Sequence, residues 1–517
     1  MSKLRHGVFW PPFLFLLASA IYSFLSPKRF EQTVTSANSW ILGHLGWLFS
    51  AGVLFFLIVV LWAYVSPIGS YRIGGPQAKP ILSRWRWFTI TLCTTIAVGI
   101  LFWGTGEPLY HYHAPASGLG IPPTSPASAR FAMSTMFMHW TIIPYGIYTL
   151  AGLMFALVYY NLRQPFSLGS MLVPLLGKQS HGTLGKVVDA VCLYSLVAGM
   201  AASLGAGILS ISGGLNTILG IPKSALLLAI ISMFIVGTFI ISAASGLQKG
   251  IRYLSDLNIK GFIGLFAFFF ILGPTSFFLS LGVEGIGEFL QSFFSRSLYT
   301  GVSGNDPWPQ NWTIFYWANW LAWTPVTALF LGRLAVGYTV KEYIQYNLFF
   351  PSLFGAAWMM VFGGTALHLD MAHDHALYGI LQDTGVENVI FRIFEEFPLP
   401  VVVSGFFLLM TFLSYVTAAD SNTTAMGGIS SVGISPDSPE PPLWIKIAWG
   451  ITIGLIAWIM VSFAGLEGIK MTSNLGGLPA LFLVFAIALG MIRLIRKPEQ
   501  LTGKTKQVDA ATQVSKD

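Results

Sequence analysis

Long apolar runs recur along the whole chain, and they constrain its fold more than any other feature. A membrane-spanning helix needs about 20 predominantly apolar residues. Only 9% of the residues are charged, against about 25% in an average soluble domain, and 15% are aromatic, which argues against a soluble or a disordered chain. We therefore expect an all-α polytopic membrane protein with twelve transmembrane helices. The runs lie at 8–26, 40–65, 86–106, 131–159, 187–218, 225–245, 253–281, 312–332, 343–365, 399–420, 443–464 and 473–494.

The distribution of Lys and Arg predicts how the chain is oriented. With a cytoplasmic N-terminus, the cytoplasmic segments hold 20 of the 28 basic residues and the outer segments hold 7, while Lys260 falls inside a span. Because Lys and Arg gather on the cytoplasmic side, we expect both termini in the cytoplasm, in a bacterial-type cytoplasmic (inner) membrane. The run at 8–26 contains Ala18-Ser19-Ala20, as in a signal peptide, but the eleven later runs favour an uncleaved first helix.

Two spans, five apart, carry helix-breaking residues. The third contains Gly99, Gly104 and Gly106, and the eighth contains Pro325. Transporters often build their binding site from interrupted helices at matching places in two halves. The spacing fits a repeat of two five-helix units, formed by spans 3–7 and 8–12. The alternative is that the glycines only allow close helix packing and that the proline only kinks its helix.

Aromatic side chains are concentrated in the same region. Rings around a dry pocket attract a quaternary ammonium group by cation–π interaction, worth up to about 2 kcal/mol when desolvated. The alternative is ordinary aromatic packing between helices. Span eight has Trp312, Tyr316, Trp317, Trp320 and Trp323, and span four has Trp140, Tyr145 and Tyr148 beside Pro144.

Several motifs resemble those of the betaine/choline/carnitine transporter family, and together they cover the chain from the first span to the twelfth. The most specific is Trp312-Thr-Ile-Phe-Tyr-Trp-Ala-Asn-Trp followed by Phe330-Leu-Gly-Arg333. Others are Gly106-Glu107-Pro108, His139-Trp140, Ser203-Leu-Gly-Ala-Gly and Val416-Thr-Ala-Ala-Asp420-Ser. The resemblance implies twelve spans with an inverted repeat, usually a homotrimer, and a small-molecule substrate that carries a quaternary ammonium or sulfonium group.

On this basis the chain divides into six parts. They are a cytoplasmic N-tail (1–7), two peripheral spans (8–85), the first five-helix repeat (86–282), an interfacial helix and loop (283–311), the second five-helix repeat (312–494) and a cytoplasmic C-tail (495–517).

The resemblance also implies a substrate site. Its aromatic cage would be Trp140, Tyr145, Tyr148 and Trp320, and Trp323 would line the path or a second, outer site. An unwound stretch near Thr95 to Gly99 would approach the substrate carboxylate, since free N–H groups at a half-helix N-terminus attract anions.

Two departures from the family pattern affect this site. The family usually has Trp where this chain has Asn319, which either hydrogen-bonds the substrate or faces another helix. Proton-coupled choline carriers of the family tend to have Asp at Gly99, so the glycine favours a zwitterion over a bare cation.

The positions that bind sodium in the betaine carriers of the family lack their oxygen ligands here. Two Thr residues are replaced by Leu196 and Met200, and a Thr-Ser pair is replaced by Thr417 and Ala418. This pattern is closest to the sodium-independent carnitine/γ-butyrobetaine exchangers, in which a fixed Arg and a Met thioether stand in for the ions. Lys260 and Met200 are the candidate substitutes, because a lysine inside a span normally marks a function or extends to the interface. Extension to the interface and ordinary packing are the respective alternatives.

The sequence therefore predicts a secondary transporter of a carnitine- or betaine-type zwitterion, working by sodium-independent alternating access and substrate exchange. The alternative is proton-coupled uptake of glycine betaine, choline or dimethylsulfoniopropionate. A membrane enzyme is disfavoured, because His44 and His139 are the in-span histidines and neither has an evident partner. Nothing indicates a cofactor or a nucleic-acid partner, and the outer segment His368–His375 has metal-ligand residue types at a spacing that fits no standard site.

Overall fold

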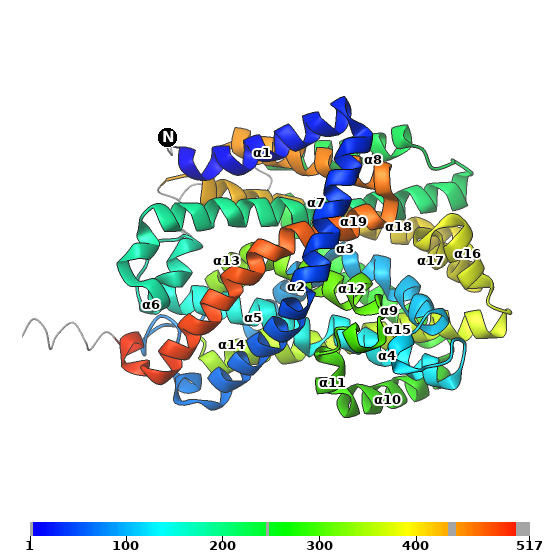
Figure 1. The fold of residues 1–517 in the computed structure, drawn as a ribbon, viewed down its shortest axis with the longest axis horizontal. Coiled ribbons are helices and arrows are strands. Elements are labelled where there is room, and N and C mark those ends of the chain that lie inside the picture. Colours follow the sequence, from blue (N-terminus) through cyan, green and yellow to red (C-terminus); the bar gives the residue numbers. More distant parts are fainter. Residues whose placement is uncertain (1–3, 245–247, 433–440, 503–517) are drawn as a thin grey trace, which may run out of the picture.

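Helices make up almost all of the regular structure. The computed structural model describes residues 4–244, 248–432 and 441–502, and within these ranges the extended pairing is limited to two isolated bridges, Leu4 with Ser431 and Arg72 with Thr339. The longer helices are α1 (His6–Leu25), α2 (Pro27–Val65), α3 (Arg84–His113), α4 (Pro126–Trp140), α5 (Ile142–Ala156), α7 (Thr183–Leu219), α8 (Ala225–Ala244), α9 (Gln248–Leu272), α10 (Thr275–Gln291), α13 (Thr313–Arg333), α15 (Phe350–Ala372), α18 (Pro400–Ser430) and α19 (Leu443–Arg496) (Figure 1).

Short helices join the long ones. They are α6 (Val173–Leu176), α11 (Phe293–Ser297), α12 (Trp308–Asn311), α14 (Val340–Ile344), α16 (Ala376–Thr384) and α17 (Val386–Glu395). Two π-helical turns, η3 (Leu157–Asn161) and η7 (Gln345–Phe349), extend α5 and connect α14 to α15.

All twelve apolar runs lie mainly in helices, but the count of twelve spans stays a prediction. By length and apolarity, eight helices of the described chain could each cross a membrane, or nine if α9 and α10 form one bent span. α3 and α13 are not among them. α19 is counted once although it contains two of the runs, which meet at a kink where Gly465 has φ 51° and ψ −126°.

The predicted fourth span is divided. Thr141 has non-helical angles (φ −124°, ψ −128°) and separates α4 from α5. Pro144 has no N–H with which to bond the carbonyl of Trp140 four residues earlier. α15 passes close to that carbonyl, since a Cβ at Gly355 would lie 2.4 Å from the Trp140 oxygen. The break therefore makes Trp140 the last residue of α4 and leaves its carbonyl against α15.

The predicted seventh span, 253–281, is wrong at its end. α9 stops at Leu272, and α10 leaves at 105° after Gly273 and Pro274. Pro274 has no backbone N–H to continue the helical hydrogen bonds, and Gly273 has more backbone freedom than other residues. The apolar run therefore does not continue as one helix. The segment expected to start at 283 as an interfacial helix therefore begins at Thr275.

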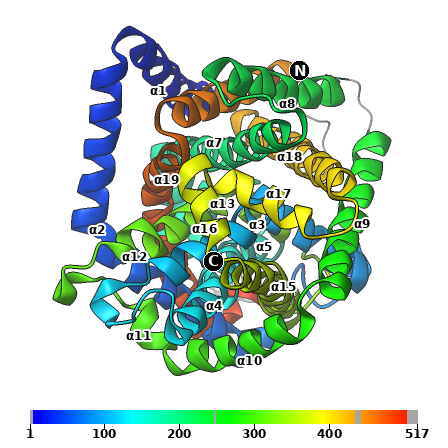
Figure 2. The ribbon, with the colours of Figure 1, turned by 90° about the vertical axis from the view of Figure 1, so that its right-hand side faces the viewer.

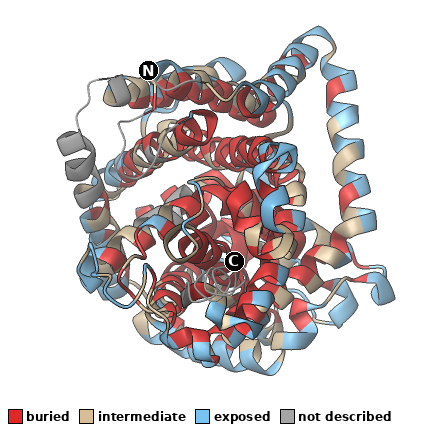
Figure 3. Ribbon diagram, turned by 90° about the vertical axis from the view of Figure 1, so that its left-hand side faces the viewer, coloured by how far each residue is buried: buried red, intermediate tan, exposed pale blue. Residues whose placement is uncertain are grey.

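α3, α5, α7 and α13 occupy the middle of the bundle, and α1, α2, α8, α9 and α10 form its rim (Figure 2). α13 packs against α5, α7 and α19, and α3 packs against α4 and α15. Burial follows this arrangement, with buried residues in the middle and exposed ones on the rim helices (Figure 3). The exposed face of α1 is apolar and includes Leu14, Phe15 and Phe24, as expected for a helix in contact with lipid.

A loop outside the predicted spans is organised by Asp306. Its carboxylate accepts hydrogen bonds from the backbone N–H groups of Gly118 and Trp308, both at 3.0 Å, and from the Tyr299 hydroxyl at 2.9 Å. Burial alone would raise the pKa of Asp306, but these hydrogen bonds outweigh it and hold the pKa below its ordinary value. Burial and the same carboxylate raise the pKa of Tyr299 to about 12.

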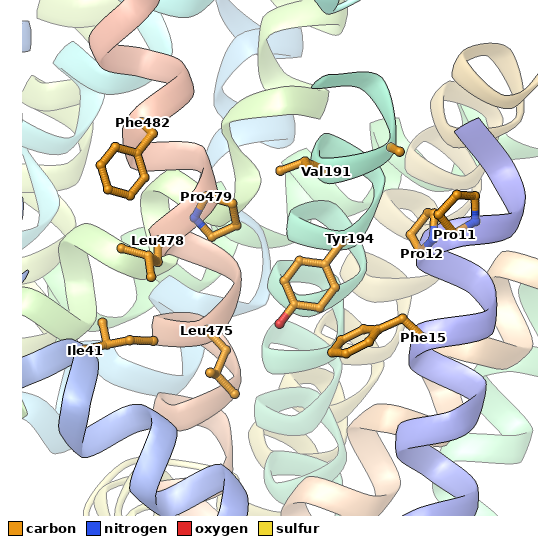
Figure 4. Close-up of a pocket in the computed structure, with 11 residues that line it drawn as sticks. Pro11, Pro12, Phe15, Ile41, Val191, Tyr194, Leu475, Leu478, Pro479 and Phe482 are labelled. Carbon is orange, nitrogen blue, oxygen red and sulfur yellow. The ribbon is translucent and has the colours of Figure 1, made fainter. Parts of the chain in front are cut away.

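An apolar pocket of about 540 Å³ lies between α1, α2, α7 and α19 (Figure 4). Pro12 and Phe15 of α1 face Tyr194 of α7 and Pro479 of α19 across it. Its lining offers hardly any polar surface and includes none of the predicted cage residues, so it is not suited to a charged solute.

Candidate functional site

Trp320 is the centre of an aromatic cluster that joins three helices. Its ring on α13 lies 5.9 Å from the ring of Trp140, 5.2 Å from that of Tyr145 and 4.9 Å from that of Tyr148, measured between centroids. All four side chains are buried. The structure thus brings together the four residues predicted to form the cage, two from α5, one from the end of α4 and one from α13.

Local geometry explains the cluster. Tyr145 and Tyr148 are three residues apart on α5 and therefore share a face, and Tyr316 and Trp320 are four apart on α13. Tyr316 contacts Trp140 at 5.3 Å between centroids. The rings meet mostly edge to face, the arrangement that aromatic quadrupoles favour.

The ring of Trp320 contacts each of the other three rings and so links them into one cluster. A cation bound at this cluster would lie within about 6 Å of the ring centroids. The indole N–H of Trp320 is buried and has no hydrogen-bond acceptor among the described residues. It is therefore a donor at the site that is not already used.

Gly99 lies against the cluster, since a Cβ there would be 3.3 Å from Cη2 of Trp140. The expected unwound stretch at 95–99 is not found: α3 is helical from Arg84 to His113 without a break. Because the helix is continuous, its backbone N–H groups are used within it. The glycines allow neighbouring side chains to approach closely, such as Val386 at Gly106. The side chain of Thr95 lies outside the described residues.

Trp323 and Asn319 contact other helices of the bundle. A Cβ at Gly199 of α7 would lie 3.2 Å from Cδ1 of Trp323, so this indole packs on α7. Asn319 accepts a hydrogen bond from the Ser473 hydroxyl of α19 at 3.1 Å. Of the two predictions for Asn319, the structure agrees with contact to another helix. Residue 319 is one position before Trp320 and therefore points about 100° away around the helix.

The four residues at the predicted ion positions have no free side-chain oxygen directed at an ion. Leu196 and Met200 are buried on α7, and the carbonyl of Met200 accepts the Tyr415 hydroxyl at 3.3 Å. The Thr417 hydroxyl donates to the Leu413 carbonyl of its own helix at 2.8 Å. Ala418 has no polar side-chain atom.

Lys260 is not placed as expected. Its side chain is exposed on α9, which packs against α18 and α15. A fixed charge replacing a bound ion has to lie in the interior, so the exposure of Lys260 does not support this role, which stays a prediction. The alternative, extension of the side chain along the protein surface to the interface, agrees with its exposure.

A buried carboxylate beside the cage was missed by the sequence analysis. Glu107 of α3 is fully buried and accepts hydrogen bonds from both Trp140 Nε1 at 2.8 Å and the Tyr316 hydroxyl at 2.5 Å on Oε2. Its Oε1 lies 2.7 Å from His139 Nδ1 and 3.1 Å from His111 Nε2. Glu107 therefore holds a cage residue and two buried imidazoles at once.

The prediction that His139 lacks a partner is thus wrong. Its other ring nitrogen lies 3.1 Å from the Thr313 hydroxyl of α13, whereas Nδ1 of His111 is buried without a partner among the described residues. The Gly-Glu-Pro motif and the His-Trp pair were both visible in the sequence. Their contact was not, because it depends on the packing of α3 against α4.

Two buried cations lie over aromatic rings that contact His111, namely Arg296 over Phe131 and Lys470 over Trp312. Arg296 donates to the hydroxyls of Ser134 and Thr135 on α4. Lys470 of α19 lies 4.4 Å from the ring centroid of Trp312, which in turn contacts the ring of His111 at 4.8 Å.

The model of the betaine/carnitine/choline transporter family matches residues 7–500. The chain belongs to this family. It is 29% identical to the glycine betaine transporter OpuD of Bacillus subtilis over 513 residues, 98% of each chain. It is 28% identical to the ectoine/hydroxyectoine transporter of Virgibacillus pantothenticus over 511 residues, 98% of this chain and 99% of the relative.

A third relative, the high-affinity choline transport protein of Escherichia coli, is 28% identical over 484 residues, 93% of this chain and 70% of the relative. A solved sodium-coupled sialic acid symporter superposes on 88% of the chain with 15% identity and a TM-score of 0.46, which says nothing about the site. As a member of its family, the chain is a multi-pass membrane transporter and not an enzyme.

Proposed function

We propose that this transporter carries a zwitterion with a quaternary ammonium group, of the betaine or carnitine type, and holds that group among Trp140, Tyr145, Tyr148 and Trp320. The observation behind the proposal is the position of Trp320, whose ring touches all three others. A quaternary ammonium group has no N–H to satisfy, so ring faces are its natural partners. The names of the relatives, which include glycine betaine and choline transporters, support the same class.

Binding requires the rings to move apart. Their centroids are 4.9–5.9 Å from Trp320, and the substrate head has to enter between α5 and α13. The carboxylate of the zwitterion also needs a donor. Because α3 is unbroken, its backbone is not available, and the unpaired indole N–H of Trp320 is the donor we assign.

We propose transport without sodium by alternating access, with exchange of one substrate for another. Sodium prefers hard oxygen ligands, and the side chains of Leu196, Met200 and Ala418 have none. The same family resemblance leads us to propose a homotrimer in an inner membrane with both termini in the cytoplasm.

Proton-coupled uptake is the second candidate, and the buried Glu107 favours it. This carboxylate shares hydrogen bonds with His139 and His111 and also holds Trp140 of the cage. A proton gained or lost within this group would be felt directly at the ring that contacts the substrate. Arg296 lies near the same group, with its guanidinium over the Phe131 ring that contacts His111.

A binding experiment tests the cage. Trp320→Leu in purified protein should weaken binding of glycine betaine or carnitine at least about tenfold, since a desolvated cation–π contact is worth about 2 kcal/mol. Trp449→Leu is the matched control, because Trp449 is an equally buried tryptophan of α19 far from the rings. Equal affinity of Trp320→Leu and the unmodified protein would refute the cage.

A transport experiment separates the coupling modes. Proteoliposomes loaded with unlabelled carnitine, γ-butyrobetaine or glycine betaine are given labelled carnitine or betaine. Uptake that depends on internal substrate, but not on sodium or a pH gradient, supports exchange. Uphill uptake driven by an imposed pH gradient, and lost in Glu107→Gln, supports proton coupling instead. Uptake only with a sodium gradient contradicts both.

A further inference from the structure

Three metal-ligating side chains from three helices converge at one end of α3. His113 is the last residue of α3, Asp370 lies near the end of α15, and His375 immediately precedes α16. Asp370 Oδ2 lies 2.7 Å from His113 Nε2 and 3.1 Å from His375 Nδ1. We propose that this cluster binds a divalent transition-metal ion of the zinc type, apart from the substrate cage.

The ligand set and the spacing fit such an ion. Two imidazole nitrogens and one carboxylate oxygen, with a fourth position left open, is a common zinc arrangement. Tetrahedral zinc with bonds of about 2.0–2.2 Å keeps its ligand atoms about 3.4 Å apart. The three donor atoms lie within 4.8 Å of one another, and the two oxygen–nitrogen separations need to widen by only about 0.3 and 0.7 Å.

The surroundings hold the ligands in place. The second oxygen of Asp370 accepts the backbone N–H of Tyr378 at 2.9 Å, and the Tyr378 ring stacks on the His113 imidazole at 3.8 Å with planes 3° apart. The N–H of His375 donates to the Asp370 carbonyl at 2.8 Å. Contacts of this kind, which orient the ligands from outside, raise metal affinity.

His375 has a left-handed backbone, with φ 63°, which is uncommon for a residue with a side chain. This conformation turns its ring toward Asp370. Its side chain is 40% exposed, whereas those of His113 and Asp370 are 8% and 0% exposed. An ion can therefore reach the cluster from the surface, and a water molecule can complete its coordination.

The neighbouring histidines do not take part. His373 lies 3.8 Å from Glu396, and the ring of His368 packs on Phe277 at 4.8 Å. The spacing along 368–375 resembled no metal motif because one ligand, His113, comes from a helix more than 250 residues earlier in the chain.

A bound ion would join α3 to α15 and α16. α3 carries Gly99 and Glu107, both beside Trp140, and α15 passes the Trp140 carbonyl at Gly355. Holding these helices together should slow any movement that opens the cage. This effect rests on the proposed transport function, whereas metal binding does not, so the two are measured separately.

Binding is tested on the purified full chain, freed of metal with a chelator and titrated with Zn²⁺ against a chromophoric competitor. We expect one ion per chain, and an affinity at least about tenfold lower in His113→Ala and in His375→Asn. Asn tolerates the left-handed backbone at position 375, which protects the fold. His368→Ala and His373→Ala are the matched controls and should bind like the unmodified chain.

No bound zinc, or equal affinity in His375→Asn and the controls, would overturn the proposed site. Transport is then measured in proteoliposomes with zinc on both sides. Slower uptake that a chelator restores, and that His375→Asn no longer shows, supports the restraint on α3. Unchanged uptake by zinc-loaded protein refutes the restraint alone.

Discussion

Replacing Glu107 by Gln and by Leu should give two very different proteins. The carboxylate receives two donors on each oxygen, with Trp140 and Tyr316 on one and His139 and His111 on the other. A glutamine can keep its oxygen toward Trp140 and Tyr316 and turn its NH₂ toward the histidines, which can accept through a ring nitrogen. A leucine offers an acceptor to none of the four.

The magnitudes follow from the hydrogen bonds. Bonds to a charged group contribute about 1.5–3 kcal/mol and neutral ones about 0.5–1.5 kcal/mol. Glu107→Gln keeps the four bonds as neutral ones and should therefore lose at most about 4–6 kcal/mol of stability. A buried donor left without an acceptor costs about 1–3 kcal/mol, and four of them cost about 4–12 kcal/mol in Glu107→Leu. This is comparable with the whole free energy of unfolding of many proteins, about 5–15 kcal/mol.

The assay is thermal unfolding of detergent-purified protein, with the yield of monodisperse material recorded for each variant. We expect Glu107→Gln to be folded with a lowered midpoint, and Glu107→Leu to be lost during purification. Asp383→Leu, at an exposed position of α16, controls for loss of a carboxylate as such. A Glu107→Leu protein as stable as the unmodified chain would refute the hydrogen-bonded network.

Three further predictions concern stability. Gly355→Ala should sharply lower the yield of folded protein, because its Cβ would lie 2.4 Å from the Trp140 carbonyl oxygen; normal yield and midpoint would contradict this. Lys470→Met should lower the thermal midpoint through loss of the cation over Trp312, worth about 0.5–2 kcal/mol, and of the 3.1 Å ion pair with the exposed Glu467; an unchanged midpoint argues against both contacts. Because the pKa of Asp306 is lowered by folding, its contribution is present above the unfolded value of about 3.9 and is lost as the pH falls through the folded value. Asp306→Asn should therefore destabilise the protein at pH 7 more than at pH 3, and an equal effect at both would refute this linkage.

The sequence was most informative about features that lie within a single helix. The apolar runs predicted the positions of the helices, and the family resemblance named Tyr145, Tyr148 and Trp320 as cage residues, which the structure brings together. It was less informative where a feature depends on neighbouring helices. Glu107 could not be paired with His139 without the packing of α3 on α4, and Lys260 could not be placed inside or outside without knowing which face of α9 is covered.

Backbone breaks were predicted in the wrong places. Glycines in α3 suggested unwinding, but a glycine permits a break without requiring one, and the helix continues. The breaks that occur are at Thr141, at Gly273 with Pro274, and at Gly465. The second includes a proline and the first lies three residues before one, Pro144, where a backbone N–H is missing.

The contact between the cage rings bears on how the carrier behaves without cargo. Trp320 contacts the rings of Trp140, Tyr145 and Tyr148 directly, so these rings have apolar partners before a substrate enters between α5 and α13. Under the proposed exchange, the return of the carrier to its starting side without substrate has to be slow. The rate of this unloaded return, compared with the rate of the loaded one, decides whether the protein accumulates its substrate or only exchanges one substrate molecule for another.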